Sequence, residues 1–575
     1  MTGLVASLLR PGHAAPNDVR KDVLWLCALW LLLVATGIGL RDPWPADEPR
    51  FALVARDMVA NHQWLIPYVG GDVYADKPPL FFWLIAGLLV LTGTMRLAFL
   101  LPSALAALGS VLLIYDLGRR LWTRQTGLAA GMALLGAIQF VWQARQAQID
   151  ATLCFFTTLG LYGLLRHLLL GPDWKWYVAG WAAAGLGIIT KGVGFLPLLV
   201  LIPYAIFRNG WQPRPAANGG WRWALGPLAL LGAVSLWGAP MLFAAQGDAA
   251  LMAYRDEILF KQTVNRYADA WHHHEPFWYF VVNVIPALWL PLTLLVPWLW
   301  FRWRENFRNR DLRVVLPLAW VLLVVLFFSL SSGKRGVYVL PALPAFALAC
   351  APWLQDLGES KGPQRALFGM ACGLAAITLL GSAYFAFVPG ARADLIEKYA
   401  IDAVAPLLVM GLIAACACAI MKPARGFAAY GLVLIGTLLV VSLWVNPAIN
   451  GGRSGADFVR QVEARTTGVA QLGVVAYKEQ YLLYITRPWW NFGHARWREV
   501  DQEAADAAAW LALDSTRVLL VDERVRDLCF SKANAESAGM ANRQRWYLVS
   551  GLPDMECVER GSANVAIRYS PPTVK

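Results

Sequence analysis

Long apolar runs separated by short polar loops dominate this chain. A helix needs about 17–25 mostly apolar residues to cross the hydrocarbon core of a bilayer. Runs that match this length predict about 13 membrane-spanning helices, near residues 22–41, 97–118, 127–143, 150–169, 174–190, 192–208, 222–244, 277–301, 313–331, 336–354, 365–388, 402–421 and 425–446. The pattern therefore predicts an all-α polytopic membrane protein over residues 1–446.

The apolar segment 80–94 is short for a span, so charge placement must decide whether it crosses. If it does not cross, the basic loops collect on the cytoplasmic side, including the loop 302–313 with its five arginines. If it crossed, that loop would face outward, against the positive-inside rule. We therefore predict that 80–94 is a juxtamembrane or re-entrant helix, that the N-terminus is cytoplasmic and that the C-terminus lies outside.

Composition supports the membrane interpretation and excludes one reading of the charge. Hydrophobic residues make up 58% of the chain and charged residues only 15%, whereas soluble proteins carry about a quarter charged residues. The net charge of +12 is then supplied by cytoplasmic loops and does not indicate nucleic-acid binding.

The last part of the chain, residues 447–575, differs in pattern. Short buried-type strands near 473–477, 517–522 and 546–550 are separated by the helical segments 501–513 and 522–535. This predicts a small α/β domain outside the membrane. Its two cysteines, Cys529 and Cys557, could form a disulfide in an oxidising compartment, while the other six cysteines are expected to be small buried hydrophobes.

The predicted topology brings polar residues from five distant segments to the outer face. Chance scatter would place such groups on both sides, and charge set against a bilayer usually serves chemistry or transport. The members are Asp47, Glu48, Arg50, Tyr74, Asp76, Lys77, Asp150, Lys191, Arg266, His272, His274, Glu275, Lys334, Arg335 and Tyr338.

Transfer from a phosphate-linked donor suits these residue types. Cations such as Lys77, Lys191 and Arg335 could neutralise a departing phosphate, as could Arg266 and Lys334. A carboxylate such as Asp47 could orient an acceptor, act as a base or stabilise a cationic sugar-ring transition state. The alternative is an interfacial loop with ordinary ion pairs, and Arg56 and Arg145 are equally typical of helix-end snorkelling residues.

A metal site is a second possibility on this face. His272, His274 and Glu275 carry ligand types that suit zinc or magnesium, although adjacent histidines cannot all point one way. The alternative is a polar stretch before an aromatic belt, and no cofactor is otherwise required.

Five short motifs in register resemble the GT-C-fold membrane glycosyltransferases that use polyprenyl-phosphate sugars. They are Asp47-Glu-Pro-Arg-Phe-Ala, Tyr74-Ala-Asp-Lys-Pro-Pro-Leu, Thr190-Lys-Gly, Asn265-Arg-Tyr with the following His-His-Glu-Pro-Phe-Trp, and Gly333-Lys-Arg-Gly-Val-Tyr. Within this superfamily, which includes protein O-mannosyltransferases, the sequence is most similar to bacterial lipid A aminoarabinose transferases. The resemblance implies catalytic carboxylates at Asp47, its neighbour Glu48 and Asp150. It implies donor or phosphate binding by Arg50, Tyr74, Asp76, Lys77, Lys191, Arg266, Lys334, Arg335 and Tyr338.

The resemblance also implies substrates and location. The donor would be undecaprenyl-phosphate-linked 4-amino-4-deoxy-L-arabinose, and the acceptor a phosphate of lipid A at the periplasmic face of the bacterial inner membrane. The product would confer resistance to polymyxin and other cationic peptides. Two alternatives stay open: transfer of a polyprenyl-phosphate hexose to protein, glycan or another lipid, and transport of a lipid-linked substrate. Transporters usually show repeated halves, and no repeat is evident here.

Overall fold

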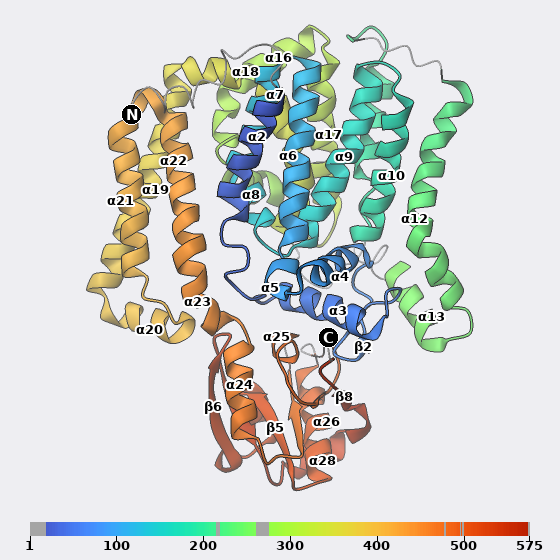
Figure 1. The fold of residues 1–575 in the computed structure, drawn as a ribbon, viewed down its shortest axis with the longest axis vertical. Coiled ribbons are helices and arrows are strands. Elements are labelled where there is room, and N and C mark those ends of the chain that lie inside the picture. Colours follow the sequence, from blue (N-terminus) through green and yellow to red (C-terminus); the bar gives the residue numbers. More distant parts are fainter. Residues whose placement is uncertain are drawn as a thin grey trace.

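A helical bundle stands above a small mixed sheet, and helices that lie crosswise separate the two (Figure 1). The computed structural model describes residues 19–213, 219–259, 275–476, 479–494, 496 and 499–572. The helices of the bundle are α2 (Val19–Trp30) with η1 (Leu31–Ala35), α6 (Leu101–Leu121), α7 (Arg124–Gly136), α8 (Ile138–Ala144), α9 (Ile149–Leu169), α10 (Trp174–Lys191), η2 (Leu196–Val200), α11 (Leu201–Phe207), η3 (Gly220–Ala224), α12 (Leu225–Ala244), η5 (Phe280–Val284), α15 (Ile285–Leu288), η6 (Thr293–Leu295), α16 (Val296–Arg308), α17 (Leu312–Leu330), η7 (Gly336–Ala342), α18 (Leu343–Glu359), α19 (Lys361–Phe387), α21 (Val404–Met421), η8 (Pro423–Arg425), α22 (Gly426–Val440) and η9 (Val441–Val445).

Within the described residues, eight helices are long and apolar enough to cross a membrane, and two bent pairs could add one span each. Each of the thirteen predicted ranges is mainly helical, but α2 with η1, α10 and η2 with α11 are shorter or less apolar than a typical span. The protein is therefore a multi-pass membrane protein, and the exact number of crossings stays a prediction.

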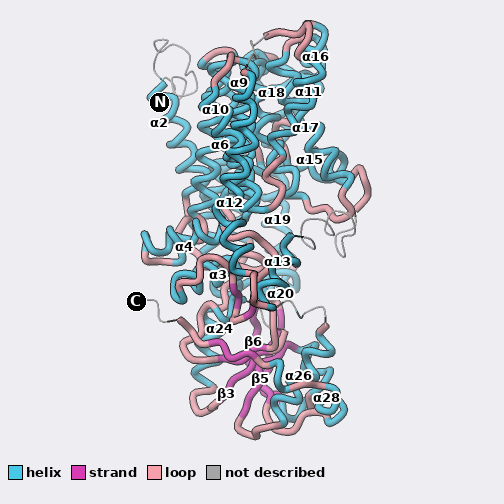
Figure 2. The backbone as a smooth tube through the Cα atoms, turned by 90° about the vertical axis from the view of Figure 1, so that its right-hand side faces the viewer, coloured by secondary structure: helices cyan, strands magenta, loops and turns pink. Residues whose placement is uncertain are grey.

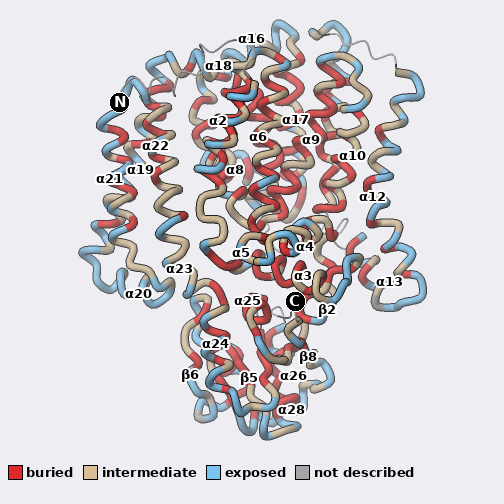
Figure 3. The backbone as a smooth tube through the Cα atoms, in the orientation of Figure 1, coloured by how far each residue is buried: buried red, intermediate tan, exposed pale blue. Residues whose placement is uncertain are grey.

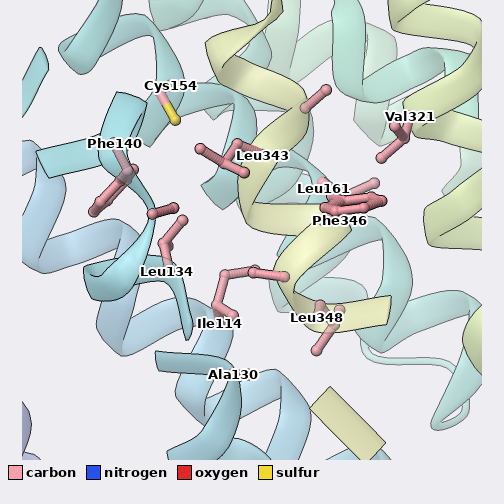
Figure 4. Close-up of a cluster of buried hydrophobic side chains, with 14 of the residues drawn as sticks. Ile114, Ala130, Leu134, Phe140, Cys154, Leu161, Val321, Leu343, Phe346 and Leu348 are labelled. Atoms are coloured by element: carbon pink, nitrogen blue, oxygen red, sulfur yellow. The ribbon is translucent and has the colours of Figure 1, made fainter. Parts of the chain in front are cut away.

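The centre of the bundle is a packed apolar core. Figure 4 shows side chains from several helices in this core, among them Ile114 of α6, Phe140 of α8 and Phe346 of α18. By contrast, α12 and α19 leave most of their residues exposed or half-buried, as the pale blue and tan colours of these outer helices in Figure 3 show. Exposed leucines such as Leu231, at 58% of full exposure, suit contact with lipid.

Short helices lie at the lower end of the bundle. They are α3 (Glu48–Asn61), α4 (Leu80–Thr92), α5 (Met95–Ala98), α13 (Ala249–Asp256), α20 (Pro389–Tyr399) and α23 (Asn446–Arg453), with the hairpin β1 (Tyr68–Val69) and β2 (Asp72–Val73). Figure 1 shows α3 and α4 crossing beneath the long helices, so the segment predicted as juxtamembrane does not run with the spans. The arginine-rich segment 302–313, which includes the end of α16 and the start of α17, lies at the opposite end.

The C-terminal part is a six-stranded mixed sheet with helices, seen from the side in Figure 2. The strand order is β6-β7-β5-β3-β4-β8; β3 pairs in parallel with β4 and β5, and the other pairs are antiparallel. The strands are β3 (Gln471–Val474), β4 (Trp489–Asn491), β5 (Arg517–Asp522), β6 (Ala535–Ala541), β7 (Gln544–Val549) and β8 (Ile567–Tyr569). The helices are α24 (Ala456–Arg465), α25 (Glu479–Leu482), α26 (Val500–Ala512), α27 (Glu523–Cys529), η11 (Lys532–Asn534), α28 (Met555–Arg560) and η12 (Ala563–Val565). The predicted second helix ends at Cys529, because the chain then turns into β6.

The two faces of this sheet bury different side chains, since residues alternate along a strand. Leu519 and Val521 of β5 point toward α26, which is rich in alanine and covers one face. Leu520 and Trp546 point the other way and share a core with Phe51 and Phe81 of the crosswise helices. The sheet is thus fused to α3 and α4 through common apolar packing.

Two further features tie the C-terminal part together. A disulfide joins Cys529 to Cys557, whose Cα atoms are 5.7 Å apart, as the sequence suggested for an oxidising compartment. One helical stretch runs from Pro423 to Arg465, so the predicted domain boundary at 446/447 falls inside a continuous helical connection.

Candidate active site

Asp47 stands at the N-terminal end of α3, where Pro49 suits the first helical turn. One carboxylate oxygen of Asp47, Oδ1, lies 3.8 Å from Nη2 of Arg50, and Oδ2 lies 3.7 Å from Nη2 of Arg335. Both distances are too long for a hydrogen bond. The carboxylate is therefore attracted to two cations but is not locked to either of them, which leaves it able to contact a substrate.

Arg50 connects this carboxylate to the C-terminal domain. Its Nε donates to Oε1 of Glu479 at 2.8 Å, and Glu479 also lies 3.5 Å from Nδ1 of His494. Burial alone would lower the pKa of Arg50, but the charges of Glu479 and Asp47 outweigh burial and hold that pKa well above its usual value. Arg50 therefore stays cationic next to Asp47.

Tyr74 packs beneath the same group. Its ring meets the ring of His494 edge-on, with centroids 5.5 Å apart, and its hydroxyl interacts with Arg50. Burial raises the pKa of Tyr74 and lowers the pKa of His494, so both groups are neutral at pH 7. Glu479 and His494 were missed by sequence reasoning, because they lie far along the chain in segments without a recognisable motif.

A second cluster joins Asp150, Lys191 and Tyr338. Asp150 sits in the first turn of α9 and Lys191 in the last turn of α10, which are the ends where each charge is favoured by the helix dipole. The ammonium of Lys191 donates to Asp150 and lies 4.7 Å from the centre of the Tyr338 ring. The amide of Tyr338 donates to the carbonyl of Arg335, so one turn links this cluster to Asp47.

Glu48 has a different environment from its neighbour. Its carboxylate forms a bidentate ion pair with the buried Arg41 and accepts hydrogen bonds from the amides of Trp44 and Ala147. With all these partners and only 8% of its side chain exposed, Glu48 holds the first loop against the turn before α9. This geometry does not support the catalytic role predicted for Glu48; it supports a positioning role.

Three cations considered in the sequence analysis bond to protein carbonyl and hydroxyl groups and not to Asp47. Lys334 is buried, and its ammonium donates to the carbonyls of Glu275 and Ser331, so it joins its own loop to the segment at Glu275. Arg56 and Arg145 do not snorkel: Arg56 bonds to the carbonyls of the 482–483 segment and to the Tyr569 hydroxyl, and Arg145 bonds to the carbonyl of Leu33 and to the Ser442 hydroxyl.

The remaining predicted site residues are Lys77, Arg266 and the predicted metal ligands. The ammonium of Lys77 donates to the carbonyl of Asp76 at 3.0 Å. Both residues lie in the loop that follows Tyr74. Arg266, His272 and His274 lie outside the described residues. Among the residues that the structure does describe, no group of three metal-ligand side chains is found. The predicted metal site at His272, His274 and Glu275 therefore stays a prediction.

Comparison with known proteins agrees with this architecture. Residues 76–237 match the family model of dolichyl-phosphate-mannose-protein mannosyltransferases. The solved structure of ArnT from Cupriavidus metallidurans bound to undecaprenyl phosphate superimposes with a TM-score of 0.72, covering 93% of this chain and 98% of that one, at 23% identity. The fold is thus the GT-C fold that the sequence motifs implied.

Two curated relatives narrow the assignment. The undecaprenyl phosphate-α-4-amino-4-deoxy-L-arabinose arabinosyl transferase of Pseudomonas aeruginosa strain UCBPP-PA14 is 32% identical over 426 residues, which are 69% of this chain and 72% of the relative. A second enzyme of that name, from Sodalis glossinidius, is 29% identical over 62% of this chain, and the match spans 64% of its own length. The chain belongs to the family of undecaprenyl phosphate-aminoarabinose arabinosyl transferases.

Proposed function

We propose that this protein transfers 4-amino-4-deoxy-L-arabinose from undecaprenyl phosphate to a phosphate of lipid A. The observation that carries the proposal is the position of the Asp47 carboxylate. It lies between Arg50 and Arg335 without a hydrogen bond to either. The chain that presents it belongs to the aminoarabinose transferase family. Product formation would reduce the negative charge of the outer membrane and so confer resistance to polymyxin and other cationic peptides.

The reaction is a displacement at the anomeric carbon. An oxygen of the acceptor phosphate forms a bond to that carbon while the bond to the oxygen of undecaprenyl phosphate breaks. Undecaprenyl phosphate leaves with the electron pair, and the acceptor monoester becomes a diester. Because the second pKa of a phosphate monoester is about 6, the acceptor is already anionic at neutral pH and needs no general base. The Asp47 carboxylate then binds the ammonium group of the sugar or stabilises an oxocarbenium-like transition state.

The departing phosphate needs a cation that is still able to bind it. Arg50 is already committed to Glu479, and Lys191 to Asp150. Arg335 has 44% of its side chain exposed, and its ion pair within the described residues is the long contact to Asp47, so its guanidinium can bind a phosphate. Lys77, in the loop that follows Tyr74, is the second cation that the resemblance assigns to the lipid phosphate.

The same proposal includes the location. The arginine-rich segment 302–313 lies at the end of the bundle opposite Asp47, and the positive-inside rule assigns that end to the cytoplasm. The active site and the disulfide-bonded domain then face the periplasm, where disulfides form. We place the protein in the bacterial inner membrane on these grounds.

The test is expression in a bacterial strain that lacks aminoarabinose transfer but makes the donor, followed by mass spectrometry of its lipid A. The proposal predicts a pentosamine-sized increment, its loss with Asp47→Asn, and its retention with Asp394→Asn, the same change at an exposed residue of α20. Unmodified lipid A from cells that contain folded wild-type protein contradicts the proposal.

A further inference from the structure

Arg453, the last residue of α23, lies against the loop that carries Asp47. Its guanidinium carbon is 4.8 Å from the centre of the Trp44 ring, and its Nη2 lies 3.4 Å from the carbonyl oxygen of Pro45. Pro45 is two residues before Asp47. Arg453 therefore approaches the loop that carries Asp47 from α23, whereas Arg335 approaches Asp47 from the segment before η7.

Trp44 is a rigid support for this arginine. Only 8% of Trp44 is exposed; its amide donates to Glu48, and its indole N–H donates to Asn450, which belongs to the same helix as Arg453. The guanidinium of Arg41 also stacks on Trp44, at 4.4 Å from the ring centre. Stacking on a fixed aromatic ring holds a guanidinium in place while leaving N–H groups at its edge able to donate.

The charge of Arg453 is not balanced by a carboxylate of its own. Among the described residues, no carboxylate lies within ion-pair distance of Arg453, and the nearby Glu48 is already paired with Arg41. Two cations, Arg41 and Arg543, also act electrostatically on Arg453. Arg543 is exposed in the turn between β6 and β7 and likewise has no ion-pair partner in the described part of the chain.

Neighbouring arginines on this face behave differently. Arg392 pairs with Asp402, Arg460 with Asp457 and Arg545 with Glu397. Arg453 and Arg543 have no counter-charge in the described part of the chain, and Arg453 is half-buried and stacked, which indicates a place where an anion from outside the chain binds.

We propose that Arg453, assisted by Arg543, binds the phosphate of the acceptor lipid beside Asp47. This inference rests on the proposed function, in which two phosphate groups must approach one anomeric carbon. Holding both at Arg335 would bring like charges together. Separate arginines, one just before η7 and one at the end of α23, let the donor and acceptor phosphates enter from different elements, and each phosphate forms charge-assisted hydrogen bonds there.

The experiment is steady-state transfer by the purified full-length protein, with the donor and lipid A varied in turn. Arg453→Gln is expected to raise KM for lipid A about 10- to 100-fold, the loss typical of hydrogen bonds to a charged group, with KM for the donor unchanged. Arg453→Lys, which keeps the charge, recovers part of the loss. Arg543→Gln raises KM for lipid A by a smaller factor, and the matched control Arg545→Gln leaves both constants at wild-type values.

An unchanged KM for lipid A in folded Arg453→Gln overturns the inference, as does an equal rise in both KM values, which would indicate a purely structural role. If Arg453→Gln does not fold, Arg543→Gln decides, because its side chain is exposed in a turn; an unchanged acceptor KM there overturns the inference. Absence of transfer by the wild-type protein is a separate result, and it contradicts the proposed function itself.

Discussion

Replacing Glu48 by Gln separates a positioning carboxylate from a catalytic one. The wild-type carboxylate pairs with both terminal nitrogens of Arg41 and accepts two backbone N–H groups, from Trp44 at 2.9 Å and from Ala147 at 3.0 Å. An amide of the same shape presents an NH₂ group to two of these four donors, because each carboxylate oxygen accepts from one nitrogen of Arg41 and one backbone N–H. It also leaves the guanidinium of Arg41, whose residue is only 4% exposed, without a counter-charge.

The size of the effect follows from burial. Removing one partner of a buried ion pair costs about 3–5 kcal/mol, because the remaining charge stays desolvated. We therefore expect the free energy of unfolding of Glu48→Gln, measured by chemical denaturation in detergent micelles with tryptophan fluorescence, to fall by about that amount. The matched control is Glu397→Gln on α20, where 57% of the side chain is exposed and less than about 1 kcal/mol is expected.

Transfer activity gives the decisive comparison. The loss of activity in Glu48→Gln should follow the loss of folded protein, and changing Arg41 as well should recover part of the stability. Asp47→Asn should show the reverse, with wild-type unfolding and transfer reduced at least about 100-fold. A Glu48→Gln protein with wild-type stability and no activity would refute this reasoning, because it would make Glu48 a catalytic group.

Three further predictions concern the C-terminal domain. Tyr569→Phe removes a hydroxyl that donates to Asp57, so the domain should loosen from α3 by about 1–3 kcal/mol, seen as faster proteolysis of the C-terminal part; unchanged proteolysis would contradict this. Burial raises the pKa of Glu503 from its ordinary 4.5 to about 7. The folded state therefore binds the carboxyl proton of Glu503 more tightly than the unfolded state does. The stability that Glu503 contributes is present below pH 4.5 and is lost as the pH rises to about 7, by about 3 kcal/mol in total. Glu503→Gln should flatten thermal stability across this range, and an unaltered pH profile would exclude Glu503 as the cause. Joint replacement of Cys529 and Cys557 by Ser should lower stability by about 2–4 kcal/mol, since the disulfide closes a loop of 28 residues; mass spectrometry of unreduced protein that finds two free thiols would refute the bond.

The spans, the crosswise α4 and the gathering of charge at one end could be predicted, because each depends on local apolar length or on loop charge. The roles of Asp47 and Glu48 could not be separated in this way. The side chains of adjacent residues at the start of a helix point about 100° apart. Asp47 therefore faces Arg335 and the site, whereas Glu48 faces Arg41.

The contribution of the C-terminal domain was also beyond sequence reasoning. Glu479 reaches Arg50 across 429 positions of sequence, and a contact at such separation leaves no periodic signal. Strand β6, with the sequence AESAGMA, has little strand propensity of its own and forms because it pairs with β7.

A structure of this protein with undecaprenyl phosphate bound tests the central claim most directly, namely that charged residues from distant segments form one phosphate-handling site around Asp47. The account predicts the phosphate within hydrogen-bond distance of the Arg335 guanidinium, on the same side of the membrane as the C-terminal domain. A phosphate bound at the arginine-rich segment 302–313, at the opposite end of the bundle from Asp47, would contradict it.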